Sequence, residues 1–349
     1  MREYYRKILT RKLSPILHNL GIHHLTKSIY SGKGQILMFH RVLPYSCKER
    51  IHNHLSIEIT PEQLIFTISY FKTKNYDIIS LDMLPEWLKN EKNTSKKFVV
   101  FTFDDGYKDN IEFAYPILKK QNIPFTIYVT TSFPDKRAIL WWYILEDLIL
   151  KNDKIQYVFL KDSVNIDCST YRKKEKAFTK LRNVITTLNP ENFDTELTGF
   201  FSKFGFNTLK YNTEMTLSWS ELTELSKDPL VTIGAHTLNH YNLCDLSDQQ
   251  SFYEILESKK LIESKINSEV KHFSYPFGVY GKREIEFANR SNFLTATTTK
   301  TANIFYNHVD HLLALPRISI NPLTTEKVLD LHVKGFFPAI LNNFKRIVH

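Results

Sequence analysis

The sequence predicts an α/β protein in which parallel strands curl into a closed or nearly closed barrel with helices outside. Short apolar runs of strand length alternate with longer stretches of helical periodicity along most of the 349 residues, and this alternation is typical of parallel sheets covered by helices. About seven such strand–helix units can be distinguished, a number that suits a barrel. Polar side chains also follow several strands directly, at the end where α/β barrels place their functional sites.

The first half of the chain supplies four of these strands. Residues 35–40 and 97–103 are apolar runs that predict buried strands. A helix is expected from residue 60 because Thr60 can cap it, Pro61 suits its first position and Gln63 completes a capping box. The other elements expected here are strands at 77–80 and 123–131 and helices at 80–90 and 107–122.

The strand rhythm lapses between about residues 134 and 215. Residues 140–150 and 170–188 have helical patterns, and the second of them is strongly basic. We expect this stretch to be an insertion into the barrel, either a lid or a second small lobe. The barrel then resumes with strands expected at 230–235, 272–278, 293–299 and 312–320 and helices at 218–228, 248–266, 283–291 and 324–333.

Charge divides the chain into three parts. The net charge is +9, and it lies at the two ends: residues 1–33 hold seven bases and one acid, and residues 334–349 hold three bases and no acid. We therefore expect a basic amphipathic segment at 1–33, the barrel at 34–320, and a closing helix with a basic tail at 321–349. The balanced charge between the ends argues against a nucleic-acid-binding body.

The ends allow two interpretations. The first segment has an apolar stripe at helical spacing, formed by Tyr5, Ile8, Leu9, Leu13, Ile16, Leu17 and Leu20. Either end could lie on an anionic membrane face, or both could dock on the core with their bases toward water. The sequence has no secretory signal pattern and no apolar run long enough to span a membrane. Because Cys47, Cys168 and Cys244 are far apart, we expect no disulfide framework and a cytoplasmic protein, associated with the inner membrane face in the first interpretation.

Two adjacent acids end the predicted strand at 97–103. Asp104 and Asp105 precede Gly106. Side chains alternate between faces along a strand, so neighbouring carboxylates share one orientation only where the strand ends. Asp-Gly is also a common turn signal. From these residues alone, a turn and a functional site explain the pair equally well.

Histidines follow two other predicted strands. His236 and His240 stand four residues apart, which places two imidazoles on one face if the stretch turns helically. His40 likewise follows an apolar run. Two histidines and one carboxylate make a three-ligand site with open positions for water, as in catalytic zinc sites. One acid of the Asp104/Asp105 pair can then bind the metal while its neighbour is left as a base.

The segments TFDDGY, HTLNH and SYPFG, in this order, resemble the signature of the NodB-type polysaccharide deacetylases, carbohydrate esterase family 4. The resemblance covers about residues 34–320 outside the insertion. It implies a distorted (β/α)7-type barrel that hydrolyses N-acetyl groups of amino sugars with a divalent metal. Carried over by position, it implies Asp105, His236 and His240 as metal ligands and Asp104 as the catalytic base.

The third motif and an aromatic pair are the expected substrate contacts. The resemblance implies the backbone N–H of Phe277 as the oxyanion donor and Tyr275 and Pro276 as the groove wall. Trp141 and Trp142 lie where related chains also carry aromatic residues. They could stack on a sugar face, although two tryptophans in an amphipathic helix are more often part of a core.

The chain departs from the family pattern at two positions. Ser274 stands where many members carry an arginine that orients the base, and we expect Arg317 to substitute for it. Many members also supply a late histidine as the acid, but His332 lies in a predicted helix and matches poorly. We therefore expect His40 to protonate the leaving amine, with a buried structural histidine as the alternative. The remaining histidines without an assigned partner are expected at the surface: His52, His54, His308 and His311.

The sequence therefore predicts a metal-dependent hydrolase that removes an N-acyl group from an amino sugar of a polysaccharide or glycan precursor. The acyl group is acetyl, with formyl as the alternative. Zinc is the expected metal, and cobalt, manganese or nickel suit the same ligands. The expected partners are an N-acylated amino sugar on a lipid-linked or nucleotide-linked carrier and an anionic membrane, with no nucleic acid. A non-catalytic carbohydrate-binding protein on the same fold is the alternative function, and a membrane-anchor module would explain only the termini.

Overall fold

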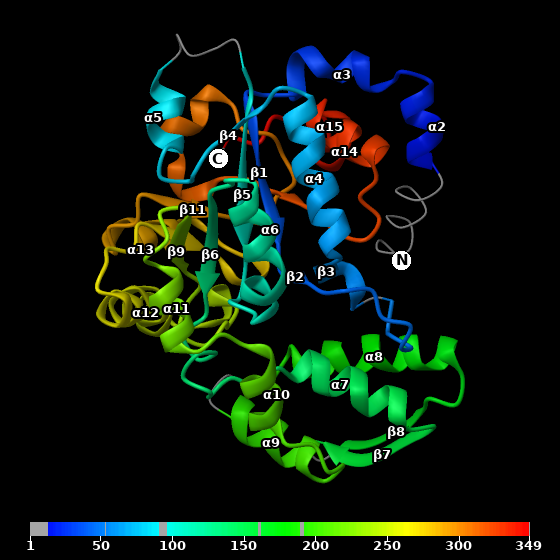
Figure 1. The fold of residues 1–349 in the computed structure, drawn as a ribbon. Helices are drawn as coiled ribbons and strands as arrows, with labels where there is room; N and C mark the ends of the chain where they lie inside the picture. Colours follow the sequence, from blue (N-terminus) through cyan, green and yellow to red (C-terminus); the bar gives the residue numbers. More distant parts are fainter. Residues whose placement is uncertain (1–12, 53, 91–95, 160–161, 189–191, 349) are drawn as a thin grey trace.

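A curled parallel sheet of eight strands forms an incomplete barrel (Figure 1). The structure, a computed structural model, describes residues 13–52, 54–90, 96–159, 162–188 and 192–348. The strand order is β11–β10–β9–β6–β5–β1–β12, and β4 also pairs with β5. The expected α/β barrel architecture is confirmed. Its strands are β1 (Gly34–Phe39), β4 (Asp77–Ile78), β5 (Phe98–Phe103), β6 (Phe125–Val129), β9 (Val231–Ala235), β10 (His272–Ser274), β11 (Thr295–Thr297) and β12 (Ile318–Ser319).

The central strands β1 and β5 are buried on both faces, as their continuous apolar runs predict. Successive side chains point to opposite faces and enter different hydrophobic cores. Leu37 and Val99 belong to the large core beneath the surrounding helices, whereas Ile36 and Val100 belong to a smaller core on the other face. The two cores hold the strand ends, and therefore the loops that follow them, in fixed positions.

Helices cover the outer face of the sheet (Figure 1). The predicted cap at Thr60 is confirmed, because its Oγ1 accepts a hydrogen bond from the N–H of Gln63 at 3.2 Å. The predicted capping box does not form, because the side-chain amide of Gln63 donates instead to the carbonyls of Asn321 and Thr324. The predicted helix at 107–122 is shorter than expected: a π-helical turn at Asn110–Ala114 leads into a short α-helix. The helices are α4 (Pro61–Thr73), α5 (Leu84–Lys89), α6 (Tyr115–Lys120), α11 (Trp219–Leu225), α12 (Asp248–Ile266), α13 (Lys282–Arg290) and α14 (Glu326–Val333).

The last predicted strand is also shorter than the apolar run at 312–320. Only Ile318 and Ser319 pair with β1, because Pro316 has no backbone N–H to donate and Leu312–Ala314 forms a 3-10 turn. The other 3-10 turns of the described residues are Leu55–Ile57, Leu243–Asp245, Pro276–Gly278 and Tyr306–Asp310.

Between β6 and α11 the chain leaves the sheet and forms a separate lobe, drawn in green in Figure 1. It contains α7 (Trp141–Lys151), β7 (Lys154–Phe159), β8 (Asp162–Asp167), α8 (Tyr171–Ile185), α9 (Phe193–Ser202) and α10 (Thr208–Met215). The antiparallel pair of β7 and β8 was not expected from the sequence. Buried residues such as Ile144, Phe178 and Phe201 give the lobe its own hydrophobic core. We refer to residues 141–215 as the inserted lobe.

A loop from the barrel reaches the inserted lobe. Beyond β1 the chain forms β2 (Arg41–Val42), which pairs in parallel with β3 (Glu58–Ile59). Residues between these strands contact α7: Arg50 forms ion pairs with Glu58 at 2.7 Å and with Glu146 of the lobe at 2.9 Å. The loop and the lobe are therefore tied together beside the carboxyl end of β1.

The terminal segments pack together at the opposite end of the barrel (Figure 1). They form α2 (Ser14–Asn19), α3 (His23–Tyr30) and α15 (Phe336–Leu341), next to α14. Leu17 and Ile22 pack on a cluster that contains Phe336 and Phe337. The predicted stripe residues Tyr5, Ile8 and Leu9 lie outside the described residues. Among the described residues, no helix is both long and apolar enough to cross a membrane.

Candidate active site

Loops that follow four parallel strands meet at one end of the barrel, on the side of the inserted lobe (Figure 1). His40 follows β1, Asp104 and Asp105 follow β5, His236 follows β9, and Tyr275 follows β10. Parallel strands bring their carboxyl ends to one edge, so segments that are distant in the sequence become neighbours. These five residues line one cavity of about 220 Å³, which we call the central pocket.

A change of backbone conformation separates the two adjacent acids. The N–H of Asp104 still donates to the carbonyl of Phe39 at 2.9 Å, as a strand residue does. Asp105 and Gly106 then adopt left-handed conformations, with φ of 80° and 83°, which Asp tolerates better than most residues. The stretch is therefore both a turn and a site, because the turn directs the two carboxylates to different partners.

Asp104 is held by a buried arginine. Nη1 and Nη2 of Arg317 donate to its two oxygens at 2.6 and 2.7 Å. Arg317 also donates to Ser274 Oγ at 3.0 Å and to the carbonyl of Thr298 at 2.9 Å, and it is 1% exposed. The guanidinium thus lies against Ser274, at the position where the sequence departs from the family pattern. Planar bidentate pairing of this kind fixes a carboxylate in orientation as well as in charge.

Asp105, His236 and His240 converge without bonding directly to one another. Each offers a ligand atom, and these atoms lie within 4.8 Å of one another. Nε2 of His236 and of His240 lie 3.5 and 3.4 Å from Oδ1 of Asp105, beyond ordinary hydrogen-bond length. That oxygen is buried and has no hydrogen-bond partner among the described residues. A divalent cation between the three atoms would satisfy it, so these side chains fit a metal.

A second interaction orients one of the imidazoles. Nδ1–H of His236 donates to the carbonyl of Ser274 at 2.6 Å. This hydrogen bond leaves the lone pair of Nε2 directed to Asp105, and backbone carbonyls commonly orient metal-binding histidines in this way. Asp105 and His236 are nearly fully buried and His240 is partly buried, so the ligand atoms converge in a region with little access to solvent.

Residues 236–240 do not form the helical turn under which their spacing would place both imidazoles on one face. The segment is a loop in which Thr237 and His240 adopt left-handed conformations, with φ of 68° and 58°. Oγ1 of Thr237 accepts from the N–H of His240 at 3.0 Å and closes the loop. The rings of His236 and His240 still meet, at 4.9 Å between centroids, because the two left-handed residues turn the chain back on itself.

Burial and charge set the protonation of this cluster. Burial raises the pKa of Asp104, but the charge and hydrogen bonds of Arg317 outweigh it and hold the pKa below its usual range. Burial also opposes ionisation of Asp105, and the neighbouring His236 and His240 lower its pKa nonetheless. Burial lowers the pKa of His240 to about 4. An ionised Asp105 and a neutral His240 are the states that metal binding requires. Burial lowers the pKa of His236, but the nearby carboxylates of Asp105 and Asp104 outweigh it and raise the pKa, so a metal would have to displace a proton from this ring.

The other predicted site residues surround the central pocket, with one exception. His40 is half-buried and lines the pocket, and Tyr275 lines it while remaining buried. Phe277 has a φ of 56° and places its exposed ring 4.7 Å from that of His240. Pro276 is buried and lines neither this pocket nor the next one. Phe277 lines the central pocket, and the groove-wall role of Pro276 stays a prediction.

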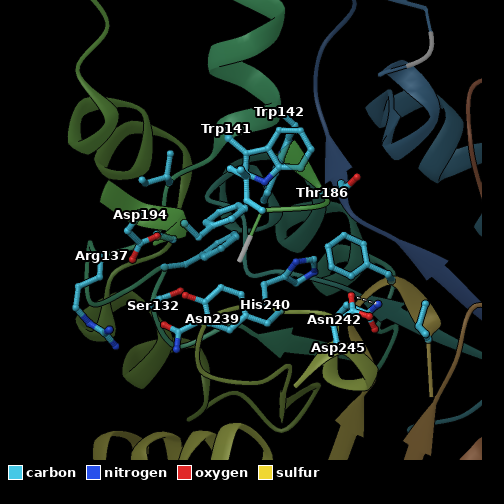
Figure 2. A pocket seen from close by; sticks show the side chains of 18 residues that line it. Ser132, Arg137, Trp141, Trp142, Thr186, Asp194, Asn239, His240, Asn242 and Asp245 are labelled. Atoms are coloured by element: carbon cyan, nitrogen blue, oxygen red, sulfur yellow. Dashed lines mark hydrogen bonds between the residues drawn. The ribbon is translucent and has the colours of Figure 1, made fainter. Parts of the chain in front are cut away.

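A second cavity of about 260 Å³ adjoins the central pocket, and we call it the side pocket (Figure 2). Trp141, Trp142, His240 and Phe277 line both cavities. Nε1–H of Trp142 donates to the hydroxyl of Tyr107 at 3.2 Å, and the indole lies 6.2 Å from the ring of His240. The side pocket is otherwise lined by aromatic and polar residues, among them Ser132, Arg137, Phe193, Asp194, Asn239 and Tyr241.

Two of the four histidines expected at the surface are buried instead. His52 and His311 are exposed, but His54 and His308 are not. His54 lines the central pocket, and its Nδ1 lies 2.5 Å from Oε2 of Glu146. Sequence reasoning missed it because its partner stands 92 residues away in the inserted lobe. No local pattern marks that contact.

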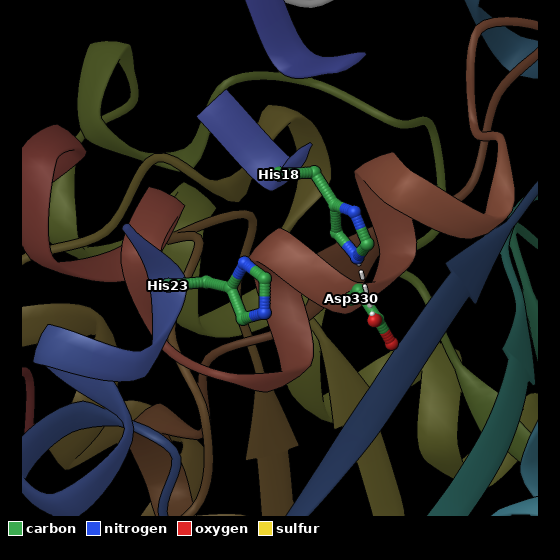
Figure 3. Close-up of side chains that lie close together, drawn as sticks. All are labelled: His18, His23 and Asp330. Atoms are coloured by element: carbon green, nitrogen blue, oxygen red, sulfur yellow. Dashed lines mark hydrogen bonds and ion pairs between the residues drawn. The ribbon is translucent and has the colours of Figure 1, made fainter. Parts of the chain in front are cut away.

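Another group of ligand-type side chains joins the terminal helices (Figure 3). Nε2 of His18 lies 2.9 Å from Oδ2 of Asp330, and His23 stacks on His18. Asp330 is already paired, because Lys334 donates to it at 2.8 Å and Tyr70 at 2.5 Å. Burial and the charge of Lys334 lower the pKa of His23 to about 4. The cation at Lys334 makes this a helix-docking cluster rather than a second metal centre.

Known proteins resemble this chain in sequence and fold. The family model "Polysaccharide deacetylase" matches residues 91–296. YxkH of Bacillus subtilis (strain 168), whose name assigns it to the polysaccharide deacetylases, is 20% identical over 280 residues, which are 80% of this chain and 72% of YxkH.

Three solved structures share the fold. Streptococcus pyogenes deacetylase PplD in complex with acetate has a TM-score of 0.55 and 20% identity, over 84% of this chain and 95% of PplD. IcaB from Ammonifex degensii has a TM-score of 0.56 and 15% identity, over 87% and 97% of the two chains. A de-N-acetylase from Aggregatibacter actinomycetemcomitans has a TM-score of 0.54 and 16% identity, over 86% and 99%.

The matched segment contains Asp104, Asp105, His236, His240 and all of the SYPFG motif, together with the inserted lobe. It covers more than half of the chain. The protein therefore belongs to the polysaccharide deacetylase family.

Proposed function

We propose that this protein is a metal-dependent hydrolase that removes an N-acyl group, in the first instance acetyl, from an amino sugar of a polysaccharide or glycan precursor. One observation carries the proposal: adjacent carboxylates have separate partners. Asp104 is ion-paired with Arg317, and Asp105 presents an oxygen without a hydrogen-bond partner to two imidazoles. Such a division suits a base beside a metal ligand.

Asp105, His236 and His240 would hold the metal. Zinc is the first choice for two imidazoles and a carboxylate, and cobalt, manganese or nickel accept the same ligands. When bound, the metal would polarise the acyl carbonyl and acidify a water molecule.

The chain's own residues supply the proton transfers. Asp104 is the base, and its carboxylate takes a proton from the attacking water while Arg317 keeps it ionised and oriented. The backbone N–H of Phe277 donates to the oxygen that becomes negative as the acyl carbon turns tetrahedral. His40, which lines the same pocket, gives a proton to the leaving amine.

The two adjoining pockets would hold the glycan. Trp141 and Trp142 line both cavities, and Figure 2 shows them on the wall of the side pocket, where an indole can stack on the apolar face of a sugar ring. Tyr275 and Phe277 complete the wall beside the metal ligands. The two cavities, of about 220 and 260 Å³, share Trp141 and Trp142 as lining residues, which supports a substrate of more than one sugar unit.

We also propose contact with an anionic membrane at the cytoplasmic face. Large apolar side chains are exposed on the terminal helices: Leu13, Ile16, Leu20, Leu25, Ile29, Ile340, Leu341 and Phe344. Arg346 joins this face, because its Nε donates to the carbonyl of Ile29 at 3.0 Å. Basic groups around an apolar surface suit anionic lipid. Cys47, Cys168 and Cys244 are free, as in a reducing compartment.

The terminal helices lie at the end of the barrel opposite the inserted lobe (Figure 1), and residues of that lobe help to line the central pocket. A membrane-bound molecule would therefore direct its pocket away from the lipid. That orientation suits a glycan that extends from a lipid carrier, with the reacting sugar at a distance from the membrane.

The alternative is a non-catalytic carbohydrate-binding protein on the same fold. Sugar binding requires the aromatic residues that line the pockets. It does not require a buried Arg317–Asp104 ion pair or three converging metal-ligand atoms. The two functions differ in whether acetate is released from a sugar that binds.

Acetate release from N-acetylglucosamine oligosaccharides and from acetylated polysaccharides tests the proposal, with the zinc-loaded full chain. We expect release by the wild type, loss of release with retained zinc in Asp104→Asn, and loss of both in His236→Ala. If wild type and Asp104→Asn bind an oligosaccharide with equal affinity and neither releases acetate, the carbohydrate-binding alternative is favoured.

A further inference from the structure

We propose that His54 and Glu146 form a substrate-orienting pair, in which Glu146 fixes the imidazole so that Nε2 of His54 accepts a hydrogen bond from a hydroxyl group of the bound sugar. The inference rests on the proposed function and adds a specificity site contributed jointly by the barrel and the inserted lobe. Glu146 is a positioning residue in this scheme, because it acts through His54.

His54 combines burial, access to the pocket and an unpaired atom. It is 6% exposed and lines the central pocket together with Asp104, Asp105 and His40. Its Nε2 is buried without a hydrogen-bond partner among the described residues. Buried polar atoms in folded proteins are rarely left unpaired, so we infer that Nε2 gains its partner when a sugar occupies the pocket that His54 lines.

Glu146 determines which imidazole nitrogen carries the hydrogen. Its Oε2 lies 2.5 Å from Nδ1 of His54, and the same carboxylate accepts from Nε and Nη2 of Arg50 at 2.9 and 3.0 Å and from the N–H of Ile51 at 2.7 Å. A carboxylate held by an arginine and a backbone N–H is ionised and can only accept. The carboxylate therefore places a hydrogen on Nδ1, and in this tautomer Nε2 offers a lone pair.

Aromatic side chains of the inserted lobe hold the ring in place. The centroid of His54 lies 4.4 Å from that of Tyr143 in α7 and 5.5 Å from that of Phe178 in α8, with Phe178 stacked on it. These contacts restrict rotation of the imidazole. A hydrogen-bonding group that is fixed before binding loses little entropy when the substrate arrives.

The surroundings of Nε2 suit a sugar hydroxyl. Phe178, Thr179 and Arg182 of α8 line the central pocket beside His54, so this wall combines an aromatic face with polar groups. Sugar hydroxyls both donate and accept, and Nε2 accepts. The wall belongs to the inserted lobe, whereas the metal ligands and Asp104 belong to the barrel. In this scheme the barrel carries the residues that catalyse hydrolysis, and the inserted lobe carries residues that recognise the sugar.

Two probes separate recognition from chemistry in the zinc-loaded full chain. 4-Nitrophenyl acetate carries an acyl group without a sugar, and the pentasaccharide of N-acetylglucosamine carries both. We expect His54→Ala to raise KM for the pentasaccharide about tenfold, the loss of one hydrogen bond, with kcat and ester hydrolysis within about twofold of wild type. His52→Ala, an exposed position in the same loop, should change neither reaction.

Histidine nitrogen NMR tests the role of Glu146 independently of turnover. In the wild type, His54 should show a protonated Nδ1 and an unprotonated Nε2, and Glu146→Gln should reverse or mix these states because an amide can donate to Nδ1. A wild-type His54 protonated at Nε2 would overturn the proposal, whether or not either probe is hydrolysed.

The activity results also distinguish this proposal from the function on which it rests. If His54→Ala lowers ester hydrolysis as much as pentasaccharide hydrolysis, or changes neither, the substrate-orienting role fails while the deacylase function stands. If the wild type releases acetate from neither probe and binds no zinc, the proposed function fails.

Discussion

Arg317 and Asp104 form a bidentate ion pair whose N–O distances are 2.6 and 2.7 Å, with both side chains almost entirely buried. The pair joins the segment before β12 to the loop after β5. Ser274 accepts a further hydrogen bond from the same guanidinium. Arg317, from the segment before β12, thus contacts the base beside Ser274 of the third motif.

The pair should be strongly coupled in stability. Arg317→Met leaves a buried carboxylate without its partner, which costs about 3–5 kcal/mol, whereas the double variant with Asp104→Asn removes that uncompensated charge. Urea unfolding of the wild type, the two single variants and the double variant measures the coupling. Additive effects of the two substitutions would show that the pair is not coupled.

His40 should act in catalysis and not in metal binding. His40→Gln removes the proposed proton donor and should lower kcat by about 10²–10⁴-fold, with zinc content equal to that of the wild type. Steady-state kinetics and elemental analysis of the same preparation make the comparison. A variant with full kcat would assign the proton transfer to another group.

The glycine of the third motif should tolerate no side chain. Gly278 has a φ of 67°, and a Cβ there would lie 2.0 Å from Oγ1 of Thr299. Gly278→Ala should therefore destabilise the fold and displace Phe277 beside the ligands. Gly199, within α9, is the matched control because nothing lies within 4 Å of an added Cβ; Gly199→Ala should stabilise by about 0.5–1 kcal/mol. Thermal unfolding measures both, and equal shifts in the two variants would contradict this explanation.

Glu146 should make stability depend on pH in acid. Burial raises its pKa, but hydrogen bonds with His54 and Arg50 outweigh this and lower the pKa to about 2. Because the folded pKa is depressed, the stabilisation is fully present above the ordinary pKa of a glutamate and is lost as the pH falls toward 2. Its size is of the order of 3 kcal/mol.

Urea unfolding between pH 6 and pH 2.5 tests this dependence in wild type and Glu146→Gln. Other carboxylates titrate in both proteins, so the difference between the two curves isolates Glu146. The difference in the free energy of unfolding between the two proteins should shrink as the pH falls below about 4. A difference that stays constant with pH would contradict the account.

Vesicle binding tests the terminal face. Leu25 is 78% exposed and Ile29 is 46% exposed on α3, so replacing both by Ser should lower co-sedimentation with vesicles that contain phosphatidylglycerol, without affecting the fold. Leu209→Ser, at an exposed apolar position in the inserted lobe, is the control. Equal binding of all three proteins would remove the membrane proposal.

The sequence predicted the parts of the molecule that local pattern determines. Apolar runs and the cap at Thr60 gave the barrel strands and the start of α4, and polar residues after strands identified the central pocket. Strand ends are predictable because the side-chain pattern changes there within a few residues. The loop at 236–240 was not predicted, because spacing alone does not distinguish a helical turn from two left-handed residues.

Contacts between segments that are distant in the sequence could not be predicted from local sequence patterns. The pairing of His54 with Glu146 and the lobe's own core depend on how α7 and α8 pack, and nothing within the loop at 43–57 indicates it. The expectation for Arg317 rested on a missing arginine at position 274, not on a pattern around Arg317 itself. Its contact with Ser274 follows from the approach of the segment before β12 to β11, where Thr297 pairs with Leu315, and only the fold defines that approach.

The most direct measurement of the central claim is the anomalous diffraction of zinc in crystals of the protein that has been stripped of metal and then reloaded. We predict one zinc per chain, bound by Oδ1 of Asp105 and by Nε2 of His236 and His240 at about 2.0–2.2 Å. A zinc bound instead between His18, His23 and Asp330, or no zinc beside Asp105, would contradict the metal-dependent mechanism.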